Sequence, residues 1–503
     1  MAADNTDELF QLIKALSKSE KKFFTQYVNL YEKGSSPLYL QVFNFLNEEP
    51  DYSEERLFKK FRDKTFKKNY PVTKHYLKQL IIKTLRHGDL TIREDRDLMV
   101  YLLDIKRLMA KGLIPMAKKM LEKLKAEAYE AEKLSDVIHM ITMQRGLISM
   151  GHYRNQPEVT LDTLDAEEDQ LFESIKQMRH IMNASIKLHG LMLHENGELP
   201  DENLKQIEQL GKLSYLHNVD ALTSVKAKHS TLQFWTLYYC ALGDYKQYYD
   251  YANRKLEFVK SEKLPVTVSN WLVVAYNHFL AASLLAGKFE GFEDKLKFLE
   301  DMELKSQFHD SDRFQTVSIY SLLYYILHND DEKILKYIEY SQEGLVRLAP
   351  FLHRTFTYTL RTIIAYSYLK VGKLDECMKE VNELMALTSG ETRRDFVGHV
   401  KIINLMLRYR MREYTYLSYL TKNTYRFFVN YLYATPVHKF VIAYLKDSMK
   451  AKGRKQLDEL NKKAVAQLKT LNYNTATESD MALVMMIDDF LKAGVNEPEK
   501  KLG

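Results

Sequence analysis

The sequence predicts an all-α protein built from repeated helical hairpins, and three observations support this fold class. The chain has 18 glycines and 10 prolines among 503 residues, whereas average usage would give roughly 35 and 25. Chains that are short of both residues usually have few turns and much helix. Sustained alternation of polar and apolar residues is absent from the sequence, and a turn motif recurs at a nearly constant interval.

Residues 1–92 are expected to form a basic helical head. Ser17 and Glu20 have the spacing of a capping box, and Ser53 precedes two acids as an N-cap, so each predicts the start of a helix. The stretch 56–86 then carries eleven lysines or arginines and one acid, Asp63, a local net charge of +10 against +6 for the whole chain. This charge makes the head the first candidate for a binding surface.

Two helices are predicted within the basic stretch, because the residue before Pro71 should leave the helical conformation. Such a pair resembles a helix-turn-helix in outline, with His75, Lys78 and Gln79 near the start of the second helix. Lysine outnumbers arginine, which favours nonspecific charge contacts. Three interpretations stay open: a nucleic-acid or ribonucleoprotein surface, a surface for an acidic protein, and a solvated face. The candidate basic patch comprises Lys59, Lys60, Arg62, Lys64, Lys67, Lys68, Lys74, Lys78, Lys83 and Arg86.

Residues 93–440 are expected to form an array of helical hairpins. Each unit has an apolar or aromatic helix end, a turn residue, a polar residue and then the start of a second helix. From the second copy onward, the turns are 44, 42, 43 and 40 residues apart. Glycine or asparagine suits them because helices often end in a left-handed residue. The positions of repeats within residues 135–225 cannot be assigned from the sequence. The turn residues are Gly112, Gly243, Gly287, Asn329, Gly372 and Arg412.

These units resemble tetratricopeptide repeats, in a divergent form with long helices. The match is best at Gly372-Lys373-Leu374 followed by Cys377, and at Gly112-Leu113-Ile114 followed by Ala117. Gly243-Asp244-Tyr245 keeps the loop but has Tyr248 where a small residue belongs. The resemblance covers about residues 98–440. It implies an extended right-handed array that binds a protein or peptide partner.

Residues 441–503 are expected to form a C-terminal helical cap, whose last segment would give the array a polar outer face. The aromatic content is unusual, with 34 tyrosines and 2 tryptophans. Tyrosines cluster in the repeat helices, for example at Tyr248 and Tyr419, where they can either pack between helices or line a groove for a partner.

Catalytic and ligand-binding motifs are missing from the sequence: it has neither a glycine-rich nucleotide loop nor a nucleophile elbow. His309-Asp310-Ser311-Asp312 could hold a metal, but such residues are more typical of a helix N-cap. Cys240 and Cys377 have no metal-ligand spacing, and no stretch has the length of a membrane span. We therefore expect a cytoplasmic protein that is not an enzyme and holds neither metal nor cofactor.

Two functions follow as hypotheses. The first is a scaffold that binds a protein or peptide through the repeat array without turnover. The second is a regulator associated with nucleic acid or ribonucleoprotein through the basic head. The sequence leaves the partner and the oligomeric state open.

Overall fold

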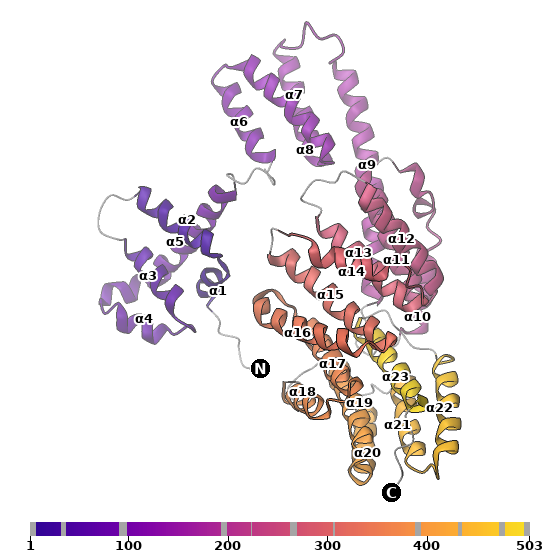
Figure 1. Ribbon diagram of the computed structural model, residues 1–503. Helices are drawn as coiled ribbons and strands as arrows, with labels where there is room; N and C mark the ends of the chain where they lie inside the picture. The colour runs from indigo at the N-terminus through magenta and orange to yellow at the C-terminus, as the bar shows by residue number, and fades with distance from the viewer. Residues whose placement is uncertain are drawn as a thin grey trace. The chain divides into compact units, whose positions relative to one another are not determined.

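The structure of the protein is a computed structural model that describes residues 7–31, 37–89, 98–192, 199–222, 224–261, 269–304, 307–387, 394–430, 435–471 and 478–496. All regular structure in these residues is helical, which confirms the predicted all-α class (Figure 1). The chain divides into two compact units, Met1–Asn155 and Gln156–Gly503. The boundaries predicted after residues 92 and 440 stay predictions.

The N-terminal helices surround one hydrophobic core. Helix α2 follows the predicted capping box, in which Glu20 N–H donates to Ser17 Oγ at 3.2 Å and Ser17 N–H donates to Glu20 Oε2 at 2.7 Å. Ser53 caps α4 by accepting from the Arg56 amide at 3.3 Å. Phe24, Phe43 and Leu57 are buried in this core. The helices are α1 (Glu8–Ala15), α2 (Lys18–Tyr31), α3 (Leu38–Glu48), α4 (Glu54–Lys60) and α5 (Lys64–Asp89).

The helix break predicted before Pro71 is wrong, because α5 continues through this proline. Phe66, Tyr70, Leu77 and Ile81 all lie in the core, so one apolar stripe extends across the proline position. An interior proline costs a helix about 3 kcal/mol, and burial of four large side chains offsets more than this. The chain breaks earlier, between α4 and α5, and the expected helix-turn-helix outline is absent at residues 69–71.

Three more helices of the first unit follow: α6 (Leu98–Ala110), α7 (Ile114–Glu130) and α8 (Leu134–Ser149). Helix α6 packs against α7, and α7 packs against α8. Gly112 links α6 to α7, and Glu132, also with positive φ, links α7 to α8. Residues 135–149, where no repeat could be assigned from the sequence, therefore belong to the third helix of this group.

The second unit begins with the long helix α9, which packs against α10 and α11. After α10, two short 3₁₀ turns, Ser214–Leu216 and Val219–Ala221, lead into the first of the hairpins. The helices are α9 (Leu161–Met192), α10 (Asp201–Leu210), α11 (Val225–Ala241), α12 (Tyr245–Ser261), α13 (Ser269–Ala286), α14 (Phe292–Asp301), α15 (Gln307–His328), α16 (Asp331–Arg347), α17 (Arg354–Lys370), α18 (Leu374–Leu387), α19 (Arg394–Arg410), α20 (Tyr414–Asn430), α21 (Pro436–Ser448), α22 (Arg454–Leu468) and α23 (Glu478–Asn496).

The hairpins from α11 to α20 pack in a regular order. Each first helix contacts its own second helix and the second helix of the preceding hairpin, as α17 contacts both α18 and α16. First helices also contact one another in succession: α13 with α15, α15 with α17, and α17 with α19.

Among the described residues, no helix combines the length and the apolar character that a membrane span needs.

The hairpin turns share one backbone geometry. At Gly372, the N–H of Lys373 donates to the carbonyl of Tyr368 at 2.9 Å, and the same bond joins Glu413 to Arg408 at 3.1 Å. This bond requires a left-handed residue after the helix end. The six predicted turn residues have positive φ: Gly112 74°, Gly243 69°, Gly287 65°, Asn329 55°, Gly372 80° and Arg412 61°.

The fifth residue after each turn is buried on the second helix, although its size varies widely. The resemblance to tetratricopeptide repeats predicts a small residue at this position, and Ala117 and Cys377 fit that expectation. The other hairpins accommodate large side chains there. The six residues are Ala117, Tyr248, Phe292, Ile334, Cys377 and Leu417, each at most 2% exposed.

The last helix, α23, is a core helix. We expected the C-terminal segment to supply a polar outer face, but the apolar residues from Met481 to Ile487, and Phe490 and Leu491, are all buried. Helix α23 packs against α22 on one side and against α15, α17 and α19 on the other (Figure 1). Asp489 anchors it, because its carboxylate meets Lys370 Nζ at 2.6 Å and accepts from the Tyr366 hydroxyl at 2.7 Å.

We expect Arg412→Gly to raise the free energy of unfolding of the α19–α20 hairpin by about 0.5–1 kcal/mol, because glycine removes the Cβ penalty of the left-handed conformation. Gly372→Ala should lower stability by about 1 kcal/mol through backbone strain alone, since a Cβ there meets no atom within 4 Å. Hydrogen exchange of the amides of α17–α20 measures both changes. Equal protection in Arg412→Gly and the unmodified chain would contradict this account of the turn.

Candidate interaction site

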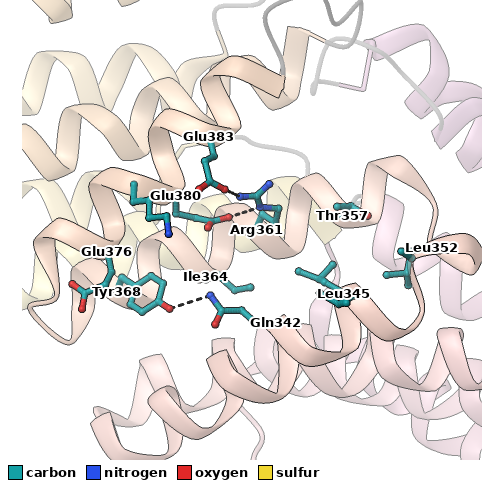
Figure 2. A pocket seen from close by; sticks show the side chains of 13 residues that line it. Gln342, Leu345, Leu352, Thr357, Arg361, Ile364, Tyr368, Glu376, Glu380 and Glu383 are labelled. Atoms are coloured by element: carbon teal, nitrogen blue, oxygen red, sulfur yellow. Dashed lines mark hydrogen bonds and ion pairs between the residues drawn. The ribbon is translucent and has the colours of Figure 1, made fainter.

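A groove of about 650 Å³ lies across two successive hairpins of the second unit. Its walls come from the second helices α16 and α18, and α17 lies between them (Figure 2). The apolar part of the lining comprises Leu345, Val346, Ala349, Leu352 and Ile364. The short 3₁₀ turn Ala349–Phe351, which joins α16 to α17, brings Ala349 to the lining.

Two polar links hold the three helices around the groove. Gln342 Nε2 on α16 donates to the Tyr368 hydroxyl on α17 at 3.1 Å. Arg361 on α17 binds two carboxylates of α18, Glu380 through Nε and Glu383 through Nη2, the latter at 2.6 Å. Figure 2 shows Ile364 between these two links, on the same helix. The groove therefore has an apolar floor with a polar link on each side.

The charge of the lining is slightly acidic. Arg361 and Lys379 oppose three carboxylates, those of Glu376, Glu380 and Glu383, for a net charge of −1. Arg361 is partly buried and shared between two of these acids, whereas Glu376 is exposed. Side chains of this kind can hold a partner segment that inserts apolar residues and presents a basic residue to the rim.

The first helices of these hairpins offer less free surface, because α23 packs on α15, α17 and α19. Tyr366 donates to Asp489, and the ring of Tyr409 lies 5.9 Å from that of Phe490. These tyrosines serve packing. Tyr248 on α12 is buried as well, whereas Tyr414 and Tyr419 on α20 are exposed. Packing therefore accounts for the buried tyrosines, whereas Tyr414 and Tyr419 stay open to solvent.

Part of the basic patch of the head is neutralised by acids from elsewhere in the first unit. Lys74 binds Asp7 and Lys78 binds Glu8, each at 2.5 Å, so two of the ten candidate residues are paired with the start of α1. Lys59 lies 3.8 Å from Glu55 on its own helix. The sequence could not reveal the pairs with α1, because about 70 residues separate the partners.

The other candidates on α4 and α5 lie mostly at the junction of the two helices. Lys60, Lys64, Lys68 and Lys83 are exposed and form no ion pair with another described residue. Lys67 Nζ lies 5.2 Å from the ring centre of Phe58. Arg62 is exposed and donates to the Lys59 carbonyl at 3.3 Å. The side chain of Arg86 lies outside the described residues.

A buried basic cluster that sequence reasoning missed joins α11, α12 and α13. Lys255 on α12 is 0% exposed, and its ammonium group donates to Gln233 on α11. Gln233 Nε2 lies 3.1 Å from Nε2 of His278 on α13, whose Nδ1 lies 3.4 Å from the Tyr248 hydroxyl. His229 stacks on Trp271 with ring centres 3.8 Å apart. No described carboxylate forms an ion pair with Lys255.

Burial decides the protonation of this cluster. It lowers the pKa of Lys255 to about 7 and that of His229 to about 3, and it holds the pKa of His278 well below its usual value. Lys255 adds to the effect on both histidines, because like charges repel. The enclosed position of Lys255 indicates a structural role, since solvent does not reach it.

The remaining sequence candidates have structural surroundings. His309 to Asp312 lie near the start of α15, where Asp310 pairs with Arg313 at 2.5 Å and with Arg347 at 2.9 Å. Cys240 and Cys377 are buried thiols, and burial raises the pKa of each to about 12. Across the ranges that the structure describes, no group of three or more histidine, cysteine or acidic residues is placed to hold a metal ion.

We expect the stability of the second unit to rise between pH 7 and 9 through Lys255. In the unfolded chain the ammonium group of Lys255 keeps its proton up to about pH 10.5, whereas in the folded chain it keeps the proton only up to about pH 7. The unfolded state therefore holds more protons between these values, and stability increases with pH. Lys255→Met should remove this pH dependence and raise the free energy of unfolding at pH 7 by a few kcal/mol, as an order of magnitude. Fluorescence of Trp235 and Trp271 during denaturant unfolding measures it.

Lys462→Met is the matched control, because Lys462 is exposed on α22. Parallel pH profiles for the Lys255 variant and the unmodified chain would contradict the depressed pKa.

Comparisons with known proteins identify no relative of this chain. No protein-family model, curated protein or solved structure matches the chain. The resemblance to tetratricopeptide repeats therefore rests on the chain itself, on its turn residues and on the spacing of its hairpins.

Proposed function

We propose that the protein is a non-enzymatic scaffold that binds a protein or peptide partner, and that the groove between α16 and α18 is the binding site. The observation that carries this proposal is the groove itself, which combines a volume of about 650 Å³, an apolar floor and an acidic rim. A pocket with apolar anchor positions and a few polar groups suits a short segment of a partner.

The wider architecture that supports this function is an extended right-handed array of the tetratricopeptide type. The successive contacts among the first helices α13, α15, α17 and α19 support such an array. Because α23 covers part of the first helices, we place the partner site on the second helices, where Val346 is 81% exposed. An apolar residue this exposed at the edge of a groove is a natural contact for a partner.

We expect the double variant Val346→Lys and Glu376→Lys to weaken peptide binding. Peptides are first selected from a random displayed library on the immobilised full chain, and their affinities are then measured by calorimetry. Loss of the apolar contact and reversal of the rim charge should weaken the selected peptides roughly 10- to 100-fold, the equivalent of about 1–3 kcal/mol. The selected peptides should carry apolar residues next to a lysine or arginine.

The matched control is Val72→Lys with Glu459→Lys, which makes the same changes at exposed positions of α5 and α22. Selected peptides that bind the groove variant as tightly as the control would exclude the groove as the site.

A second candidate function is association with nucleic acid or ribonucleoprotein through the head. Exposed lysines without an ion pair to a described residue favour it, namely Lys60, Lys64, Lys68 and Lys83. Their ammonium groups can replace counterions on phosphates without reading sequence. The pairing of Lys74 and Lys78 with α1 leaves fewer cations for this role than the sequence suggested.

We expect replacement of these four lysines by glutamine to reduce the salt dependence of duplex DNA binding. Each lost phosphate contact lowers the slope of log affinity against log salt by about 0.9, so the slope should fall by up to roughly 3.6. Fluorescence anisotropy between 50 and about 200 mM salt measures it. The control replaces Lys455, Lys462, Lys463 and Lys469 of the exposed face of α22 and its end. Equal slopes in both variants would reject this function.

A further inference from the structure

A second groove, of about 430 Å³, lies between α20 and α21, away from the groove of the scaffold proposal. Three lysines from different positions line it: Lys422 on α20, Lys446 on α21 and Lys450 just after α21. The hydroxyl groups of Thr415 and Ser418 line it too. None of the described residues in the lining is acidic. Cations and hydroxyl donors in a lining that contains no described carboxylate are the chemistry that binds phosphate.

The lysines of this groove are largely uncommitted. Lys422 is exposed and forms no ion pair with another residue in the described ranges. Lys446 Nζ lies 5.7 Å from the ring centre of Tyr425, an attraction that leaves its charge available. Lys450 lies 3.6 Å from Asp447, with both side chains more than half exposed. Such an exposed pair contributes little energy, so an anion can compete for this lysine.

Exposed tyrosines accompany the lysines along α20. Tyr414, Ser418, Lys422 and Tyr425 follow one another at spacings of three or four residues, so they share one face of the helix. Tyr414 is 43% exposed and Tyr425 is 44% exposed, and Tyr419 on the flank of this face is 61% exposed. Phenol rings beside a cationic groove can stack on unpaired bases while the lysines contact the backbone.

We propose that the groove between α20 and α21 binds a strand of single-stranded nucleic acid. The phosphates lie against Lys422, Lys446 and Lys450, and the bases stack on the exposed tyrosines of α20. Lysine contacts of this kind carry no base preference, and hydroxyls of Thr415 and Ser418 add hydrogen bonds to phosphate oxygens. A groove between two helices accepts one strand, and a duplex would keep its bases away from the rings.

The test uses the full chain with Lys60, Lys64, Lys68 and Lys83 already replaced by glutamine, so that the head contributes little. Anisotropy of a labelled mixed-sequence oligonucleotide of about 12 nucleotides is measured against salt, in single-stranded and duplex form. Lys422→Gln, Lys446→Gln and Lys450→Gln together should weaken single-strand binding at least tenfold and lower the salt slope by roughly 2, at about 0.7 for each contact. Lys462→Gln, Lys463→Gln and Lys469→Gln form the control of equal charge.

Ultraviolet cross-linking followed by peptide mass spectrometry gives an independent readout, with adducts expected on Tyr414, Tyr419 or Tyr425. The proposal is overturned by equal effects of the two triple variants, by tighter duplex than single-strand binding, or by adducts confined to residues 54–89. It is also overturned if a phosphopeptide binds this groove and the oligonucleotide does not. Because the background lacks the four exposed head lysines that form no ion pair with a described residue, binding by the head contributes little to these outcomes.

Discussion

The left-handed residue at the end of each first helix is the constraint on which the rest of the second unit depends. It lets the residue that follows donate back to a carbonyl five positions earlier, as Lys373 does to Tyr368, and it satisfies a carbonyl that would otherwise lack a partner. The short turn brings the second helix back along the first. Every contact between neighbouring hairpins, and the groove between α16 and α18, presupposes this reversal. Glycine makes it at low cost, while Asn329 and Arg412 make it with positive φ and a side chain.

Burial of polar groups is the second theme of the fold. The pair formed by Lys370 and Asp489 is almost completely enclosed, at 8% and 7% exposure of the two side chains, and Tyr366 completes the bonds of the carboxylate. A satisfied pair of this kind fixes the position of α23 more than it adds stability, because desolvation offsets most of the attraction. Lys255 is the opposite case. It is enclosed and forms no ion pair with a described carboxylate, so burial lowers its pKa to about 7.

Charge separates the candidate surfaces. The groove between α16 and α18 has an acidic rim, whereas the groove between α20 and α21 is lined by three lysines and no described acid. The net charges of the two linings therefore have opposite signs, although the grooves lie on helices that follow closely in the chain. In the head, Asp7 and Glu8 neutralise two lysines of α5, so local sequence charge overstates the charge that a partner meets. Net charge in a window of sequence is a guide to a surface only when the pairs across the fold are known.

The sequence by itself determined the features that depend on neighbouring residues. Caps such as Ser17 with Glu20, the left-handed turns, and the all-helical class could be predicted, because each is decided by bonds within a few residues. Tertiary structure alone decided whatever depends on distant partners. It carries α5 through Pro71, because burial of Phe66 to Ile81 outweighs a local cost. It buries α23, encloses Lys255, and assembles both grooves from separate helices. Packing sums interactions over the whole unit, and no local pattern in the chain contains that sum.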